Sequence, residues 1–201
     1  MDLEEQGRYD DAAREFEKAL AIDSDLALAH DNLGLLLVYK QQYDQAAKEH
    51  RKATSLVPTN TNFHRHLAQA LSHGGKFSEA TPEYKYVLNA KPNDPQASNG
   101  MGYALAQQGQ FDEAIPYIQK ALTAEPNNSD FLDSLAFALA GKQQYQEAVA
   151  LYQKALSANP KEAIIHFHLA QSLEKLDRAD EARHEFDTAY QLDPGLKTRP
   201  W

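Results

Sequence analysis

The eight histidines are the side chains with the clearest capacity for chemistry, because an imidazole can bind a metal ion or exchange a proton near neutral pH. Their spacing does not predict a metal site. His64 and His66 are two residues apart, so on a helix they point to different faces. His66 and His73 share a face, but about two turns, roughly 10 Å, separate them, which is too far for one ion. No His-Glu-x-x-His pattern occurs, and we expect no metal and no cofactor.

The remaining reactive residues do not form a recognisable catalytic group. The chain has no cysteine, which excludes disulfides, thiolate metal ligands and cysteine nucleophiles. Gly74, Gly75 and Lys76 resemble part of a phosphate-binding loop, but the upstream glycine is missing, so a turn between helices is the better interpretation. Asp130 and Asp133 share a helix face without a catalytic setting. The sequence therefore predicts a protein that is not an enzyme.

The charge balance argues against nucleic-acid binding. The chain has 20 Lys and Arg residues against 29 Asp and Glu residues, a formal net charge of −9, whereas phosphate-backbone binding needs clustered positive charge. No apolar run approaches the roughly 20 residues of a membrane-spanning helix, so no direct membrane insertion is expected. The first residues do not resemble a signal peptide. We expect a cytoplasmic protein, with the periplasm or another compartment left open if a signal lies outside this sequence.

The elements that must position these residues are indicated by two series that repeat every 34 residues. The prolines of the first series are Pro58, Pro92, Pro126, Pro160 and Pro194. The alanines of the second series are Ala12, Ala46, Ala80, Ala114, Ala148 and Ala182. A constant interval of this size indicates one supersecondary unit stacked on copies of itself. A small residue at the same place in every unit predicts close contact between neighbouring backbones.

Each interval is expected to contain two helices. In residues 129–162, Phe131, Leu135 and Leu139 recur at helical spacing, and a second apolar series starts at Tyr145 after a turn. The residues expected to cap second helices through a side-chain oxygen are Asp10, Asp44, Ser78, Asp112 and Asp180. A first helix is expected to begin at Asp94-Pro95, where a capping residue precedes a proline.

With these series in place, the chain resembles the tetratricopeptide repeat (TPR) family over residues 1–194. The residues that carry the resemblance, with copies downstream, are Leu33, Gly34, Tyr43, Ala46, Ala53 and Pro58. The resemblance implies an all-α fold, a right-handed superhelical α-solenoid of antiparallel helix pairs. It divides one continuous solenoid domain into a partial repeat 1–26 (the end of a first helix plus a second helix), repeats 27–60, 61–94, 95–128, 129–162 and 163–196, and a tail 197–201.

The family usually binds a peptide, helix or domain of a partner protein in a concave groove lined by its first helices. The resemblance thus implies a non-enzymatic protein–protein interaction scaffold. One alternative is a recruiting or regulatory TPR region of a larger enzyme such as a transferase. Another is an end-to-end structural unit that self-associates, because neither end of the repeat array carries a capping helix. The family often has tryptophan near the start of its first helix, where this chain has histidine in three repeats: His30, His64 and His166.

The resemblance also assigns the residues expected to line the groove. They are Asn32, Leu35, Tyr39, Arg65, His66, Gln69, His73, Asn99, Tyr103, Phe137, Phe167, His168 and Gln171. Aromatic and aliphatic residues among amides suit an amphipathic peptide, since side-chain amides can bond its backbone. Gly100 is expected to face the same groove, either as a hinge or as a place where a ligand backbone comes close.

Overall fold

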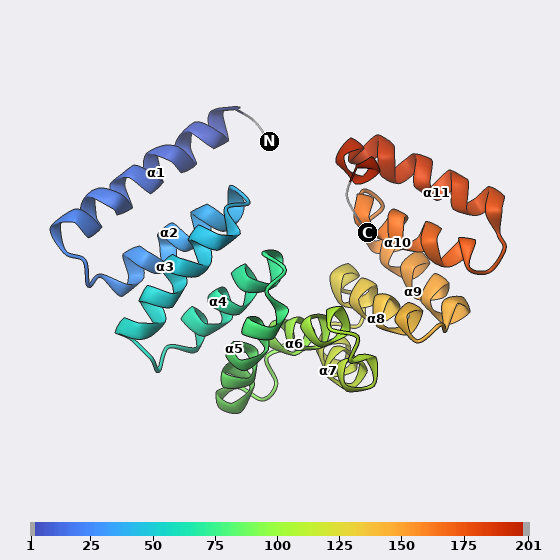
Figure 1. Ribbon diagram of the computed structural model, residues 1–201, viewed down its shortest axis with the longest axis horizontal. Coiled ribbons are helices and arrows are strands. Elements are labelled where there is room, and N and C mark those ends of the chain that lie inside the picture. Colours follow the sequence, from blue (N-terminus) through green and yellow to red (C-terminus); the bar gives the residue numbers. More distant parts are fainter. Residues whose placement is uncertain (1–2, 199–201) are drawn as a thin grey trace. The chain divides into compact units, whose positions relative to one another are not determined.

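The computed structural model describes residues 3–198, with side chains from Arg8 onward, and every regular element in that part is helical (Figure 1). The elements are α1 (Leu3–Ile22), α2 (Ala27–Tyr39), α3 (Tyr43–Leu56), α4 (Thr61–His73), α5 (Phe77–Ala90), α6 (Pro95–Gln107), α7 (Phe111–Ala124), α8 (Ser129–Gly141), α9 (Tyr145–Ala158), α10 (Ala163–Glu174), α11 (Ala179–Leu192) and a short 3₁₀ helix, η1 (Pro194–Lys197). The all-α prediction is confirmed.

Five helix pairs follow the 34-residue interval. Their first helices, α2, α4, α6, α8 and α10, begin at residues 27, 61, 95, 129 and 163, which are the first residues of the expected repeats. Each pair α2–α3, α4–α5, α8–α9 and α10–α11 packs as a hairpin. The chain falls into two compact units, which we call unit 1 (residues 1–100) and unit 2 (residues 101–201); the boundary lies inside α6.

The alanine series lies where helices pack most closely. In unit 1, Ala46 and Ala80 are 0% exposed, as are Ala114 and Ala148 in unit 2. At Gly102, a Cβ atom would lie 2.4 Å from Cγ1 of Ile118 and 2.8 Å from the Ala114 carbonyl oxygen. Contacts this short leave no room for a larger side chain. This explains why small residues recur at these positions in every repeat.

Three first helices are fastened by a histidine that bonds at both ends of its ring. The Nδ1 atoms lie 2.5 to 2.7 Å from a glutamate of the following helix, in the pairs His30–Glu49, His64–Glu83 and His166–Glu185. The Nε2 atoms lie 2.9 to 3.1 Å from the backbone carbonyl oxygen six residues earlier, at Ser24, Pro58 and Pro160. Carboxylates and carbonyls accept hydrogen bonds, so each nitrogen of these rings faces an acceptor. The histidine therefore joins its helix to both the next helix and the preceding turn.

The predicted caps of the second helices are wrong. The residues before these helices, among them Gln42 and Gln110, make no side-chain capping bond, and Asp44 and Asp112 lie inside the first turn. These two aspartates instead pair with a lysine at the turn of the next hairpin, Asp44 with Lys76 and Asp112 with Lys142, each at 2.6 Å. An acidic side chain in the first turn also interacts favourably with the helix dipole, which is why the same residue type suits both positions.

Side-chain caps occur on first helices instead. Asp94 accepts a 2.9 Å bond from the Ala97 amide and Pro95 begins α6, as predicted. Asn60 and Asn128 accept equivalent bonds at the starts of α4 and α8.

The turn implied by the expected division of residues 1–26 into two helices is absent from the described part of that segment. The helix α1 runs without interruption from Leu3 to Ile22, so the described part of residues 1–26 is one helix and not the end of one helix followed by another. A turn there would break helical hydrogen bonds and gain packing only if a partner helix were present beside it. No helix in the described part of the chain is both long enough and apolar enough to cross a membrane.

Candidate functional site

Three first helices of unit 2 each contribute one ring to a half-buried row. Tyr103 comes from α6, Phe137 from α8 and His168 from α10. The ring centroids of Tyr103 and Phe137 are 6.2 Å apart, and those of Phe137 and His168 are 5.6 Å apart. The sequence placed all three on the groove face, and the structure brings them together.

A pocket of about 340 Å³ opens beside Phe137 and His168. Its lining comes from α8, α9 and α10 and consists of Phe137, Ala140, Gly141, Tyr145, Tyr152, His168, Gln171, Ser172, Glu174 and Lys175. Tyr152 is only 1% exposed, whereas Glu174 and Lys175 are exposed. The pocket thus combines aromatic walls with an amide and with charged groups at its edge, which suits an apolar side chain carried by a polar backbone.

Hydrogen bonding holds the rings of this site in place. The Nδ1 atom of His168 lies 3.0 Å from a carboxylate oxygen of Asp133. The Gln107 amide donates a 2.8 Å bond to the Tyr103 hydroxyl. Burial raises the pKa of Tyr103 and, together with the nearby charge of Asp133, raises the pKa of Tyr152 well above its ordinary value. Both phenols therefore stay neutral at physiological pH and can donate hydrogen bonds.

A second polar cluster lies in unit 1, where the sequence did not predict one. Asp31 of α2 accepts hydrogen bonds from Nδ1 of His50 (2.8 Å) and Nδ1 of His66 (3.0 Å), which belong to α3 and α4. Asp31 is 5% exposed and His50 is 0% exposed. Burial raises the pKa of Asp31, but the hydrogen bonds and charges of the two histidines outweigh this and lower it to about 2. The carboxylate is therefore ionised at any physiological pH.

Comparison with known proteins identifies the repeat. Two tetratricopeptide repeat descriptions match the chain, one at residues 32–95 and 67–129 and the other at residues 3–38. The chain belongs to the TPR family. Residues 107–189 are also similar to the family described as anaphase-promoting complex, cyclosome, subunit 3. No curated protein sequence matches significantly.

Solved TPR structures share the fold. MamA from Desulfovibrio magneticus RS-1 is 21% identical, with a TM-score of 0.66, over 86% of this chain and 97% of that chain. YrrB, described as a TPR protein with an unusual peptide-binding site, is 19% identical, with a TM-score of 0.60, over 90% of this chain and 94% of that chain. PilF from Pseudomonas aeruginosa is 23% identical, with a TM-score of 0.66, over 82% of this chain and 75% of that chain.

One residue assigned to the TPR groove is buried instead. Phe167 is 3% exposed, and its ring packs edge-on against Phe186 of α11 at 5.4 Å. Leu196 of η1, 1% exposed, belongs to the same core cluster. The prediction for Phe167 is wrong because Phe186 and Tyr190 of α11 and Leu196 of η1 pack against it.

The groove residues assigned to unit 1 are exposed to different degrees. Leu35 and Tyr39 are 40% and 39% exposed, but the Tyr39 ring lies 4.2 Å from the Tyr9 ring of α1. Asn32 and His73 are exposed, and Arg65, His66, Gln69 and Asn99 are half-buried. In unit 2 Gln171 is half-buried and lines the pocket beside His168.

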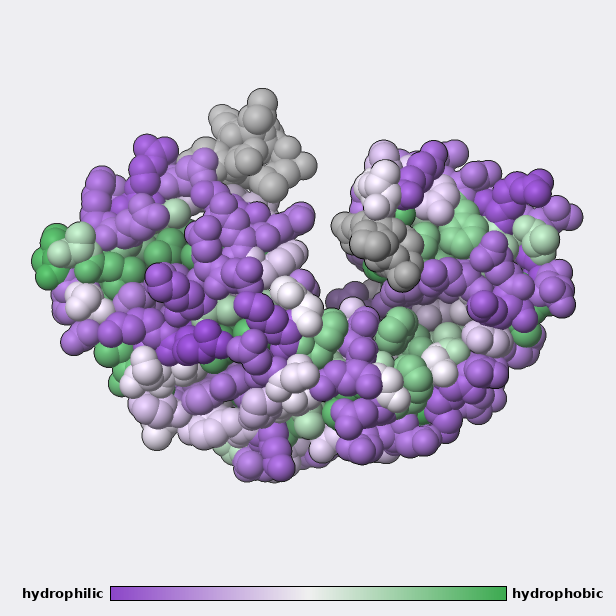
Figure 2. Space-filling view, viewed as in Figure 1, coloured by the Kyte–Doolittle hydropathy of each residue, from purple (hydrophilic) through white to green (hydrophobic). Residues whose placement is uncertain are grey.

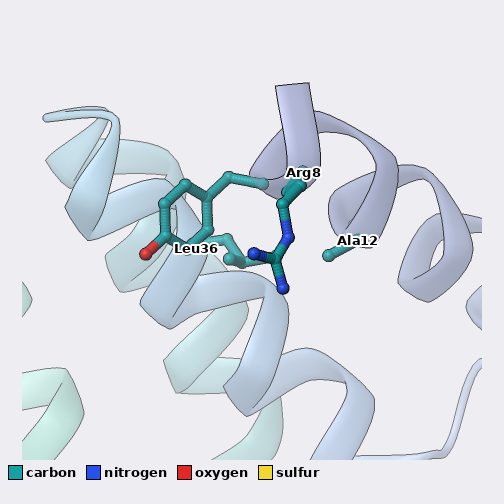
Figure 3. Close-up of a pocket in the computed structure, with 4 residues that line it drawn as sticks. Arg8, Ala12 and Leu36 are labelled. Carbon is teal, nitrogen blue, oxygen red and sulfur yellow. The ribbon is translucent and has the colours of Figure 1, made fainter. Parts of the chain in front are cut away.

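The contact between α1 and α2 encloses a pocket of about 320 Å³ in unit 1. Figure 3 shows the Arg8 side chain extending from α1 toward Leu36 of α2, with Ala12 beside it. The small Ala12 side chain leaves this space open, and the arginine partly fills it. Among the described residues its lining has one charged group, on Arg8, and one hydroxyl, on Tyr9, so it offers less for recognition than the pocket in unit 2.

Gly100 allows close helix packing, which is neither the hinge nor the ligand contact expected from the sequence. A Cβ atom at this position would lie 2.4 Å from Cζ of Tyr84. Tyr84 is 2% exposed, so its ring cannot move away easily. The glycine lets α6 lie directly against that ring, a close approach that a sequence without coordinates does not reveal.

Proposed function

We propose that this chain is a non-enzymatic interaction scaffold that binds a peptide segment of a partner protein on the first helices of unit 2. The observation that carries the proposal is the pocket of about 340 Å³ beside Phe137 and His168, in a row of rings contributed by three successive repeats. Aromatic walls beside a few oriented polar groups are typical of sites that take one apolar side chain of an extended or helical peptide.

The chemistry of the pocket favours a particular peptide. An apolar or aromatic side chain would contact Phe137 and Tyr145, while the amide of Gln171 could bond the peptide backbone. At the exposed edge, Glu174 and Lys175 present one charge of each sign, so the site lacks the strong positive field that an acidic tail would need. The preferred ligand is therefore an apolar anchor in a peptide of low net charge.

The wider surface agrees with a localised site. The face visible in Figure 2 is mostly hydrophilic, with hydrophobic residues confined to smaller patches. One patch lies where α1 leads into α2, where Ile22 and Leu28 are 89% and 67% exposed. Neither residue lines the pocket beside Phe137.

The test is selection of binding peptides from a random displayed library with the full chain, followed by titration of one selected peptide by fluorescence anisotropy. We expect selected sequences to share an apolar anchor, and Tyr103→Ala with Phe137→Ala to weaken binding at least about tenfold, as hot-spot aromatics do. Tyr86→Ala, which removes a ring that is 38% exposed on α5, is the control. Undiminished affinity of the double variant, with circular dichroism unchanged, would show that the peptide binds elsewhere.

A further inference from the structure

The cluster of Asp31, His50 and His66 has a composition that the peptide site does not need. Its members come from three helices of two successive repeats, and one potential ligand atom from each lies within 4.8 Å of the other two. We propose that these three residues form a binding site for a divalent transition-metal ion, with Zn²⁺ the best fit. This inference is independent of the proposed peptide function.

The donor set selects the class of ion. Two imidazole nitrogens and one carboxylate suit zinc and neighbouring transition metals, and the same set occurs in zinc sites with an open fourth position. Calcium and magnesium prefer oxygen ligands, of which this cluster offers only those of Asp31. Three protein ligands leave at least one coordination position for water or for a group from a partner.

The distances are close to those of a metal centre. With bonds of about 2.0 to 2.2 Å, neighbouring ligands of a tetrahedral zinc ion lie about 3.3 to 3.5 Å apart. Asp31 is already 2.8 Å from Nδ1 of His50 and 3.0 Å from Nδ1 of His66, so the ion needs these pairs to separate by only a few tenths of an ångström. The ligand nitrogens of the two histidines lie within 4.8 Å of each other, so they must approach by about 1.5 Å at most. His66 has room to move, because its side chain is 17% exposed.

Packing already fixes the position of His50. Its ring lies over Gly34, where a Cβ atom would come within 2.6 Å of it. Its Nε2 atom is buried without a hydrogen-bond partner among the described residues. The Nδ1 atom faces Asp31 and would bind the ion, so Nε2 would carry the proton of the ring and take no part in coordination.

The equivalent positions in unit 2 show the same arrangement without the third ligand. Asp133 and His168 repeat the contact of Asp31 and His66, with a 3.0 Å hydrogen bond. At the position 102 residues, or three repeat lengths, after His50 stands Tyr152, which is buried as completely as His50. The repeat therefore accommodates a tyrosine where unit 1 has its third ligand. Unit 2 has two of the three ligands and is expected to bind the ion much more weakly.

The experiment is equilibrium dialysis of the full chain, first freed of metal with a chelator, against ZnCl₂ in the micromolar range. We expect one zinc ion per chain. His50→Tyr, which copies unit 2, and Asp31→Asn should each weaken binding at least tenfold. His168→Ala, which removes the matching histidine of unit 2, should bind zinc as the unmodified chain does. No stoichiometric zinc in the unmodified chain, or equal binding by His50→Tyr, would overturn the proposal.

A second measurement tests the zinc site even if a variant fails to fold. X-ray absorption at the zinc edge of the unmodified complex should show two imidazole ligands and otherwise oxygen. A spectrum with fewer imidazoles, or with the same shell after His66→Gln, would place the ion on other surface residues and overturn the proposal. Thermal unfolding of the unmodified chain should also shift upward with zinc, because an ion that binds only the folded state stabilises it.

Discussion

At the residue scale, a histidine bonded at both ring nitrogens takes the place where TPR first helices often have tryptophan. Replacing His64 by alanine removes its bonds to Glu83 and to the Pro58 carbonyl and leaves a partly buried carboxylate without its partner. We expect the free energy of unfolding to fall by about 1–3 kcal/mol, measured by urea denaturation. The exposed His184 makes the matched control, and His184→Ala should change stability by less than about 0.5 kcal/mol. Equal effects of the two substitutions would mean that the two hydrogen bonds of His64 contribute nothing to the free energy of unfolding.

Tyr152 should make the protein sensitive to alkali. Burial, followed by the charge of Asp133, raises its pKa well above the ordinary 10.0. The unfolded chain then releases this proton at a pH where the folded chain still holds it. The stabilisation is complete below pH 10 and is lost above it, by up to about 1.4 kcal/mol per pH unit. Denaturation between pH 8 and 11 should show a shallower decline for Tyr152→Phe than for the unmodified chain; parallel curves would contradict this.

At the scale of elements, α6 depends on a glycine. Gly100→Ala places a methyl group 2.4 Å from the buried Tyr84 ring, so we expect a loss of about 1–3 kcal/mol from overpacking. This outweighs the gain of about 1 kcal/mol that alanine brings to a helix. Shortening the ring with Tyr84→Leu should restore part of the loss in the double variant, as measured by thermal unfolding. If Gly100→Ala alone stabilises the protein, α6 does not pack closely on Tyr84. Gly100 would then be explained by one of its expected roles, as a hinge or as a place where a ligand backbone comes close.

The same scale shows what the sequence could and could not predict. The 34-residue interval predicted the starts of α2, α4, α6, α8 and α10, because small and large residues recur where hairpins stack. It failed for the caps, since Asp44 serves equally well as a cap or as a first-turn residue paired with Lys76. It also failed for Phe167, which is covered by α11 and η1. The repeat pattern describes an average unit and does not indicate what covers a terminal one.

The contact between Asp31 and His66 could not be predicted from the sequence, for a different reason. The two residues are 35 positions apart, one more than the repeat, and only the packing of α2 against α4 brings their side chains together. Spacings of three or four residues, which relate ligands on one helix, do not include this pair. An interval of one repeat plus one residue relates this pair and also Asp133 to His168.

At the scale of the whole molecule, the division of the chain after Gly100 predicts two regions that respond separately to damage. In repeat arrays each unit is stabilised mainly by its neighbours, so the effect of a cavity declines with distance along the array. Leu71 in unit 1 and Leu173 in unit 2 are 2% and 1% exposed, and replacing either by alanine should remove about 2–5 kcal/mol locally. Hydrogen exchange followed by mass spectrometry should show that Leu71→Ala lowers protection mainly in α3, α4 and α5. Leu173→Ala should lower it mainly in α9, α10 and α11. Uniform loss of protection over residues 3–198 in both variants would show instead that the chain unfolds as one cooperative body, in which the boundary inside α6 has no energetic meaning.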